Sequence, residues 1–224
     1  MKRPRVFPTQ VVASLLTLLP WVLAEPSALS DNPSTTHASP SSEAPLRGTP
    51  YPSTRPAAEV EQRVETLLGS LTPEEKISLL SGDGSDGMST IAIPRLGIPK
   101  MIMADGPQGV RAHGPACSFP SGIALAATWD PKLAFRYGEA LGREARARGI
   151  HIQLGPGVNI ARTPLNGRNF EYYGEDPFLT GELALNYIKG LQSQGVAATV
   201  KHFVGNDAEW RRMEIDSVMD EQTI

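Results

Sequence analysis

The chain has 224 residues, of which 40% are apolar and 20% are charged, and its formal net charge is −3 at pH 7. This composition is typical of a globular protein with enough apolar residues for a core, in one large domain or two small ones. The acidic balance disfavours a nucleic-acid partner, because such partners bind to basic surfaces. The one cysteine, Cys117, excludes an internal disulfide and a Cys-x-x-Cys pair, so we expect a small buried side chain there.

The first 24 residues have the pattern of a secretory signal peptide. Lys2, Arg3 and Arg5 precede an uncharged apolar stretch that ends in small residues at Ala24. A membrane anchor is disfavoured, because this stretch is shorter than the about 20 residues of a spanning helix and contains Pro20. We therefore expect secretion or export to the periplasm, no stable membrane span, and a mature net charge of −6, with 18 basic and 24 acidic residues.

Residues 25–56 are rich in Pro, Ser and Thr and poor in apolar residues, which predicts a disordered linker before a folded domain at 57–224. In AAEVEQRVETLLGSL, apolar side chains recur at helical spacing and predict a first helix. In LTPEEKISLLSG, Thr72 and Glu75 form a capping box, and Gly82 marks the end of a second helix.

From residue 91 onward, short apolar runs alternate with helical patterns. The runs KMIMAD, IHIQLGP and VAATVKHF predict three strands. Between them we predict helices over 130–149, with Asp130 as the N-cap and Gly149 as the stop, and over 178–195. Such alternation implies parallel strands with crossover helices, and therefore an α/β sheet or barrel.

Polar side chains follow all three predicted strands, where the carboxyl ends of parallel strands form one ligand-binding edge. They are Asp105 after the first strand, Asn159, Arg162 and Arg168 after the second, and Lys201 and His202 at the end of the third.

The motif ADGPQGVR begins with an acid at a strand end and turns on its glycines and proline, so Asp105 and Arg111 can face one pocket. An ionised carboxylate accepts hydrogen bonds from vicinal hydroxyl groups, which suits it to hold a pyranose. The alternative is that Asp105 only initiates an Asp-Gly turn and Arg111 is a surface charge.

The loop GRNFEYYGEDPFL combines Arg168 and several acids with aromatic side chains. Aromatic rings pack on the apolar face of a sugar while charged groups bind its hydroxyls. The alternative is that Asp176 caps the following helix and the aromatic residues belong to the core. Both interpretations can hold at once.

Lys201 and His202 are adjacent, so on a regular strand they point to opposite faces unless the strand is ending or a bulge intervenes. A metal site at His202, Asp207 and Glu209 is disfavoured, because no His-x-His or His-Glu-x-x-His pair is present. The acidic residues of this region are interpreted as partners of Arg211 or Arg212.

Five segments carry a more specific signal: LTPEEKISLLSG, IPRLGIPKMIMADGPQGVR, FPSGIALAATWDP, LGPGVNIARTPLNGRNFEYYGEDPFLTG and KHFVGNDAEWRR. In this order and spacing they resemble the N-terminal catalytic domain of glycoside hydrolase family 3, above all its β-glucosidases. The resemblance covers nearly everything after the linker. It implies the N-terminal portion of a (β/α)8 TIM-like barrel and an O-glycosyl hydrolase with no cofactor and no metal.

The resemblance also implies roles for five residues. Asp105 binds hydroxyls of the non-reducing-end sugar, Arg111 lies close to that loop, and Arg168, Lys201 and His202 bind hydroxyls in the subsite next to the scissile bond. Since both Lys201 and His202 reach the sugar in the family pattern, the third strand is expected to depart from plain alternation at its end.

Within the family, the loop Asp-Gly-Pro-x-Gly-x-Arg is similar to that of β-glucosidases, and KHFVGND lacks the KHFPGHG run of the N-acetylglucosaminidase branch. The expected partner is a β-glucoside or oligosaccharide, hydrolysed at terminal non-reducing β-D-glucosyl residues with retention. A β-xylosidase is the alternative within the family. The sequence carries no indication of oligomeric state.

Retention requires two carboxyl groups about 5–5.5 Å apart. The resemblance places the nucleophilic aspartate beyond residue 224 and the acid/base glutamate in a following domain, so no catalytic residue is expected within this chain. A barrel takes about 250 residues and roughly 165 follow the linker, so we expect an incomplete barrel that is inactive alone and either poorly soluble or partly unfolded. One alternative is a non-catalytic sugar-binding remnant. Another is an unrelated α/β hydrolase or aldolase-type barrel, which is disfavoured because the sequence has no Gly-x-Ser-x-Gly motif.

Overall fold

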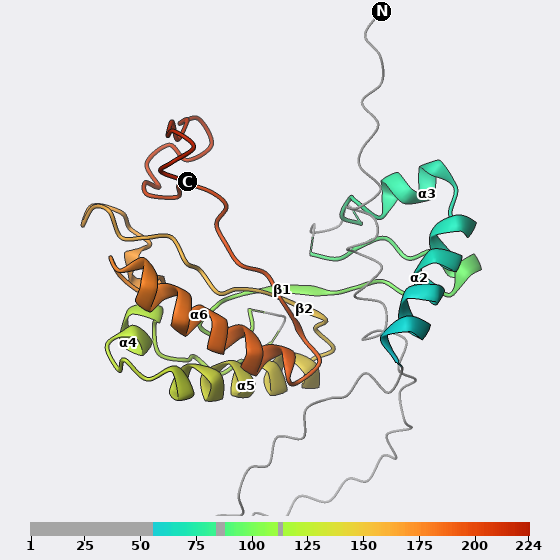
Figure 1. Ribbon diagram of the computed structural model, residues 1–224, viewed down its shortest axis with the longest axis horizontal. Helices are drawn as coiled ribbons and strands as arrows, with labels where there is room; N and C mark the ends of the chain where they lie inside the picture. The colour runs from blue at the N-terminus through green and yellow to red at the C-terminus, as the bar shows by residue number, and fades with distance from the viewer. Residues whose placement is uncertain (1–55, 84–87, 112–113) are drawn as a thin grey trace, which may run out of the picture.

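The computed structural model describes residues 56–83, 88–111 and 114–224 (Figure 1). The expected signal peptide and all but the last residue of the expected linker lie outside the described residues. A small sheet runs between two groups of helices: one close to the start of the described chain, and a larger one formed by its later helices (Figure 1).

The sheet has three parallel strands in the order β1-β2-β3. They are β1 (Met103–Asp105), β2 (Ile152–Leu154) and β3 (Ala197–Ala198). Each lies inside one of the three predicted apolar runs and is shorter than that run. The parallel pairing confirms the α/β prediction. β3 ends three residues before Lys201, which pairs with Gly157 in an isolated parallel bridge, so regular strand alternation does not extend to His202.

Two long crossover helices, α5 (Pro131–Ala147) and α6 (Pro177–Gln192), lie side by side on one face of the sheet (Figure 1). Both begin as predicted from their caps. The side chain of Asp130 accepts a hydrogen bond of 2.8 Å from the backbone N–H of Lys132. α5 is followed by Gly149 with φ 70°, a left-handed conformation that glycine adopts without strain.

At the start of the described chain, α2 (Ala57–Ser70) is followed by the short helix α3 (Pro73–Ser78). The capping box is present: Thr72 accepts from the Glu75 N–H at 3.2 Å, and the Glu75 carboxylate accepts from the Thr72 N–H at 2.8 Å. α3 ends before the predicted stop at Gly82, because Gly82 pairs with Thr90 in an antiparallel bridge that draws the chain out of the helix.

The buried apolar side chains form two separate clusters. The smaller cluster joins α2 and α3 to the segment before β1, through η2 (Pro94–Leu96). The main cluster lies between the sheet, α5 and α6, and also takes in α4 (Gly122–Ala126). Its most deeply buried large members are Leu141, Leu183, Tyr187 and Leu191. This cluster fixes the strand ends relative to the two crossover helices.

Cys117 is exposed, so the prediction of a buried side chain is wrong. The cysteine lies in an extended segment, and its backbone holds it there: its N–H donates to the Glu144 carboxylate at 3.0 Å. Its carbonyl packs so closely against Gly109 that a Cβ on that glycine would lie 2.5 Å from the oxygen. With the backbone facing the protein, the thiol is left at the surface.

Among the described residues, no helix has both the length and the apolar character that a membrane span requires.

Asp176 caps α6 as predicted, accepting a hydrogen bond of 2.9 Å from the Phe178 N–H. We expect Asp176→Ala to lower the free energy of unfolding by about 1 kcal/mol, because that N–H loses its acceptor. Asp176→Asn keeps an acceptor oxygen and should change the free energy of unfolding by only a few tenths of a kcal/mol. Urea denaturation of the full chain and both variants measures the difference; equal stability of the Ala variant and the unaltered chain would contradict the capping role.

Candidate functional site

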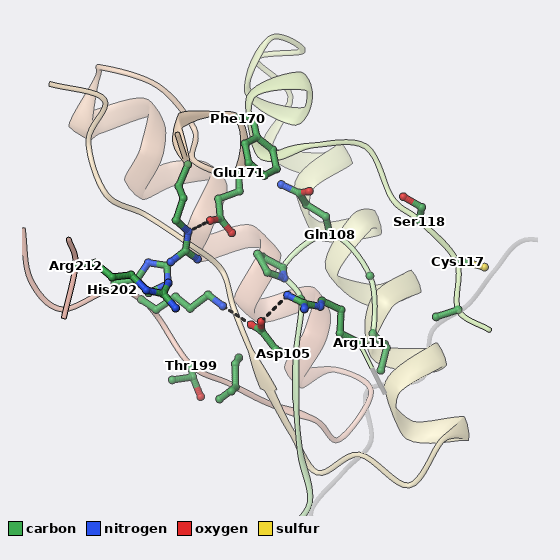
Figure 2. A pocket seen from close by; sticks show the side chains of 18 residues that line it. Asp105, Gln108, Arg111, Cys117, Ser118, Phe170, Glu171, Thr199, His202 and Arg212 are labelled. Carbon is green, nitrogen blue, oxygen red and sulfur yellow. Dashed lines mark hydrogen bonds and ion pairs between the residues drawn. The ribbon is translucent and has the colours of Figure 1, made fainter. Parts of the chain in front are cut away.

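The carboxyl ends of the three strands open into a cavity of about 970 Å³ (Figure 2). All five residues that the sequence assigns to sugar binding line this cavity: Asp105, Arg111, Arg168, Lys201 and His202. They come from the loops after all three strands. The structure thus brings the five together at the edge where parallel strands place their ligands.

Asp105 is the last residue of β1 and lies at the centre of the view in Figure 2. Its two carboxylate oxygens bind two different cations: Oδ1 lies 2.6 Å from Nζ of Lys201, and Oδ2 lies 3.0 Å from a terminal nitrogen of Arg111. The Lys201 side chain is only 14% exposed, whereas that of Arg111 is 76% exposed. Lys201 is therefore the inner partner and Arg111 the outer one.

The turn after Asp105 depends on two glycines with positive φ, Gly106 at 106° and Gly109 at 145°. A Cβ on Gly106 would lie 2.0 Å from the carbonyl oxygen of Gly109, so a side chain there is excluded. Burial alone raises the pKa of Asp105, but the hydrogen bond and charge of Lys201 outweigh it and hold the pKa below its ordinary value. Asp105 is therefore an ionised acceptor at neutral pH.

Arg168 precedes the short helix η3 (Asn169–Glu171) and is held by two acids. Its guanidinium pairs with the buried carboxylate of Glu171 and lies 3.3 Å from the Glu209 carboxylate. Burial lowers the pKa of Arg168, and the hydrogen bond and charge of Glu171 more than reverse this, so the group stays charged. Two acids on different loops thus fix the orientation of one donor in the cavity.

In the loop at residues 167–179, some aromatic side chains belong to the core and another lines the cavity. Tyr172 and Tyr173 are buried in the protein, whereas Phe170 is 54% exposed and lines the cavity. The predicted cap at Asp176 is also present. Part of the loop therefore belongs to the core and part to the site.

His202 is fixed through its backbone by Asn159, which follows β2. The His202 N–H donates to Oδ1 of Asn159 at 2.8 Å, and Nδ2 of Asn159 donates to the His202 carbonyl at 3.1 Å. Both Lys201 and His202 line the cavity, as the family resemblance implies. This is possible because the regular strand β3 ends at Ala198, before the pair.

The His202 ring is oriented by a buried hydroxyl. Nδ1 lies 3.1 Å from the hydroxyl oxygen of Tyr172, which accepts a 2.7 Å hydrogen bond from Nδ2 of Asn206. Nδ1 also lies 3.3 Å from Oδ1 of Asn159, so two side chains hold the ring through this one nitrogen. Asn206 was not identified from the sequence; a polar residue soon after a strand end is the signal that could have indicated it.

Among the described residues, no group of three His, Cys, Asp or Glu side chains is placed to hold a metal ion. The three residues considered for a metal have other partners. His202 contacts Tyr172, Asp207 lies 3.6 Å from Arg162, and Glu209 lies 3.2 Å from Arg212, the predicted partner of that region.

The pKa of His202 is held below 6.5, first by burial and then by the positive charges of Arg168 and Lys201. The folded protein therefore disfavours the charged ring. Its contribution to stability is fully present above about pH 6.5 and is lost as the pH falls through the folded-state pKa. An NMR titration of the ring should give a midpoint below 6.5; a midpoint at or above that value would contradict this environment.

His151 is also buried and its pKa is also lowered, so the unaltered chain loses stability from two histidines over the same pH range. Replacing His202 by Gln isolates its share. We expect denaturation midpoints of the His202→Gln variant to fall less between pH 7 and pH 5 than those of the unaltered chain.

Known proteins resemble this chain in sequence. Residues 68–218 match the model of the glycosyl hydrolase family 3 N-terminal domain. A β-glucosidase of Rhizobium radiobacter is 51% identical over 168 residues, which are 72% of this chain and 20% of that protein. The thermostable β-glucosidase B of Acetivibrio thermocellus is 47% identical over 173 residues, 72% of this chain and 23% of that protein. The chain thus spans about a fifth of the length of these relatives.

Solved structures give the same result for the fold. The complex of β-glucosidase 3B from Thermotoga neapolitana with glucose matches with a TM-score of 0.62 and 41% identity, over 66% of this chain and 24% of that one. The β-glucosidase of Kluyveromyces marxianus in complex with glucose matches with a TM-score of 0.62 and 45% identity, over 65% and 18%. The parallel sheet and its crossover helices are therefore part of a TIM-barrel-like α/β fold, as predicted. On sequence and fold alike, the chain belongs to glycosyl hydrolase family 3, within the N-terminal domain of that family.

Proposed function

We propose that the cavity binds the terminal glucosyl unit of a β-glucoside. The observation that carries this proposal is the convergence of Asp105, Arg168, Lys201 and His202, from three separate strand ends, on one cavity of about 970 Å³. The relatives named above are β-glucosidases, and two solved neighbours hold glucose. Together these support glucose over an unrelated ligand.

The chemistry of the four side chains suits a polyhydroxylated ring. Asp105 is an ionised acceptor that can take hydrogen bonds from two neighbouring hydroxyls. Lys201 and Arg168 are charged donors, and His202 adds a ring nitrogen; each of these side chains is held by a partner on another segment. Because the ion pairs orient these groups before the ligand arrives, little conformational entropy is lost on binding.

We further propose that this domain serves the retaining hydrolysis of terminal β-D-glucosyl residues. That reaction needs a nucleophile and an acid/base, two carboxyl groups about 5–5.5 Å apart. Both carboxylates that line the cavity, Asp105 and Glu171, are held in ion pairs with cations. In this proposal they orient the sugar and the donors, and other parts of the family fold supply the reacting carboxyl groups. The basic and apolar start of the chain supports export as the location.

A second candidate function is sugar binding without catalysis. It is favoured by the same observation, namely that the cavity carboxylates are engaged as ion-pair partners. Incubation of the chain with an aryl β-glucoside separates the two: release of the aryl group indicates hydrolysis, and glucose binding without release indicates a binding protein.

Isothermal titration of the full chain with glucose tests the shared part of both proposals. From a chain that folds cooperatively, we expect a saturable heat with glucose and a weaker one with xylose, which lacks the hydroxymethyl group. Stronger binding of xylose would favour the β-xylosidase alternative. A cooperatively folded chain that gives no saturable heat with either sugar would contradict the proposed function.

A further inference from the structure

Gln153 is the middle residue of β2 and has no exposed surface. Parallel strands covered on both faces normally carry apolar residues at such positions, so a buried amide requires an explanation. Its oxygen, Oε1, is buried and has no hydrogen-bond partner in the described part of the chain. An unpaired buried polar atom destabilises the folded state, so the amide is poorly suited to a role in folding alone.

The other end of the amide is fully used. Nε2 of Gln153 donates to the backbone carbonyl of Asp105 at 3.1 Å and to that of Gly106 at 2.6 Å. Carbonyl oxygens only accept hydrogen bonds, so the group that faces both must be the NH₂ and not the amide oxygen. Both amide hydrogens therefore end on the turn that carries the Asp105 carboxylate.

That turn already has hydrogen bonds of its own. The Arg111 N–H donates to the Asp105 carbonyl at 2.9 Å, and the Gly109 N–H donates to the Gly106 carbonyl at 3.3 Å. Without the Gln153 amide, both carbonyls would keep a donor. The amide therefore adds a link between the turn and β2, and is not needed to close the turn.

The place of Gln153 in the sheet explains what this link does. β2 is the central strand, and Gln153 is paired with Ala104 of β1 on one side and with Ala198 of β3 on the other. β1 ends in Asp105, and the loop after β3 carries Lys201, whose Nζ lies 2.6 Å from the Asp105 carboxylate. Gln153 thus stands on the strand between the two halves of the ion pair at the centre of the cavity.

We propose that Gln153 is a positioning residue of the sugar site, which sets the distance between the Asp105 carboxylate and Lys201 by tying the turn after β1 to the central strand. The expected effect of Gln153 on the ion pair follows from the hydrogen bonds and strand pairing described above. Its effect on glucose affinity rests on the proposed function.

The first test is Gln153→Leu in the full chain, which keeps the approximate size of the side chain and removes the amide. We expect the denaturation midpoint to stay equal or rise, because the unpaired Oε1 is removed with the amide. The pKa of Asp105, followed by ¹³C NMR of its carboxyl carbon, should rise toward its ordinary value as the Lys201 hydrogen bond loosens. Glucose affinity should fall about tenfold, the effect of one weakened charge-assisted hydrogen bond. Gln192→Leu, at an exposed position, is the matched control and should change neither the pKa of Asp105 nor the affinity for glucose.

The second test is Gln153→Glu, which separates a hydrogen-bond role from a packing role. A buried carboxyl that faces two carbonyl oxygens has a raised pKa, and its protonated form donates a hydrogen bond as the amide does. We expect the affinity of this variant for glucose, relative to the unaltered chain, to be nearly normal at low pH and to fall as the pH rises through that pKa. A packing role predicts a ratio that does not change with pH.

The outcomes separate this proposal from the proposed function. A folded Leu variant with an unchanged Asp105 pKa and unchanged glucose affinity overturns the positioning role. A raised Asp105 pKa in that variant, with no glucose binding by the unaltered chain, supports the positioning role and contradicts the proposed function. If the Leu variant does not fold, the pH dependence of the Glu variant decides: a ratio independent of pH overturns the positioning role.

Discussion

Asp105→Ala is expected to abolish measurable glucose binding. The carboxylate is the ionised acceptor at the centre of the cavity, and in the proposed mode it takes hydrogen bonds from two sugar hydroxyls. Each hydrogen bond to a charged group contributes about 1.5–3 kcal/mol, so the loss of both weakens binding by at least about 100-fold. Isothermal titration of the variant and the unaltered chain with glucose measures the change.

The same substitution leaves Lys201, whose side chain is 14% exposed, without its carboxylate partner, so stability must be measured beside affinity. Asp105→Asn keeps the size of the side chain and should bind glucose with intermediate affinity. Asp216→Ala removes an equal charge from an exposed position and should bind as the unaltered chain does. Dissociation constants within twofold for Asp105→Ala and the unaltered chain would rule out the assigned role.

If this segment is joined to the catalytic carboxylates that the family resemblance places beyond residue 224, the effect of Asp105→Ala extends to catalysis. Hydrogen bonds to the sugar that strengthen in the transition state raise kcat as well as affinity. We then expect kcat/KM on an aryl β-glucoside to fall by orders of magnitude. A nearly unchanged kcat/KM would contradict the assignment.

Gly190→Ala is expected to destabilise the main core strongly. Gly190 lies where α6 crosses α5, and a Cβ there would be 2.0 Å from the carbonyl oxygen of Phe135 and 2.8 Å from the backbone nitrogen of Glu139. On the facing helix, a Cβ on Gly138 would lie 2.0 Å from the carbonyl oxygen of Tyr187. Because these atoms belong to helix backbones, they cannot rotate away, and the helices must separate.

Overpacking of a core typically costs about 1–3 kcal/mol, and we expect a loss of about 3 kcal/mol in the free energy of unfolding here, where backbone meets backbone. Gly181→Ala is the matched control in the same helix, since a Cβ at Gly181 would have open space around it, with no contact within 4 Å. Alanine favours the helix over glycine by about 0.5–1 kcal/mol, so the control should gain stability. Urea denaturation of both variants gives the two values, and equal effects would show that the helix crossing is not the cause.

Local signals in the sequence determined the helices. α5 and α6 begin after Asp130 and Asp176, whose side chains accept hydrogen bonds from N–H groups two residues further along. Gly149 follows α5 with the left-handed conformation that ends a helix. These features involve a few consecutive residues, so they can be predicted without knowledge of the fold. α3 ended early because a tertiary pairing at Gly82 overrode the local signal.

The alternation of strands and helices also determined which residues would share one edge. Asp105, Arg168 and Lys201 follow three different strands, and parallel pairing brings them to one cavity. For this reason the candidate site could be located from the sequence. The same reasoning did not predict the exposed thiol of Cys117, because side-chain exposure in an extended segment depends on which backbone groups bind its neighbours.

The pairing of the charges was decided by the tertiary structure alone. Lys201 and Asp105 are 96 residues apart and meet at 2.6 Å only because β1 and β3 flank the central strand in this register. The buried amide of Gln153 binds the turn after β1 for the same reason, and in the sequence it is one more residue of a strand. Caps depend on backbone geometry within one turn, whereas these contacts depend on strand order, register and the length of each strand. Residue types and their order therefore determine which polar groups share one edge of the sheet, and the packing of the strands determines which charges hold each other there.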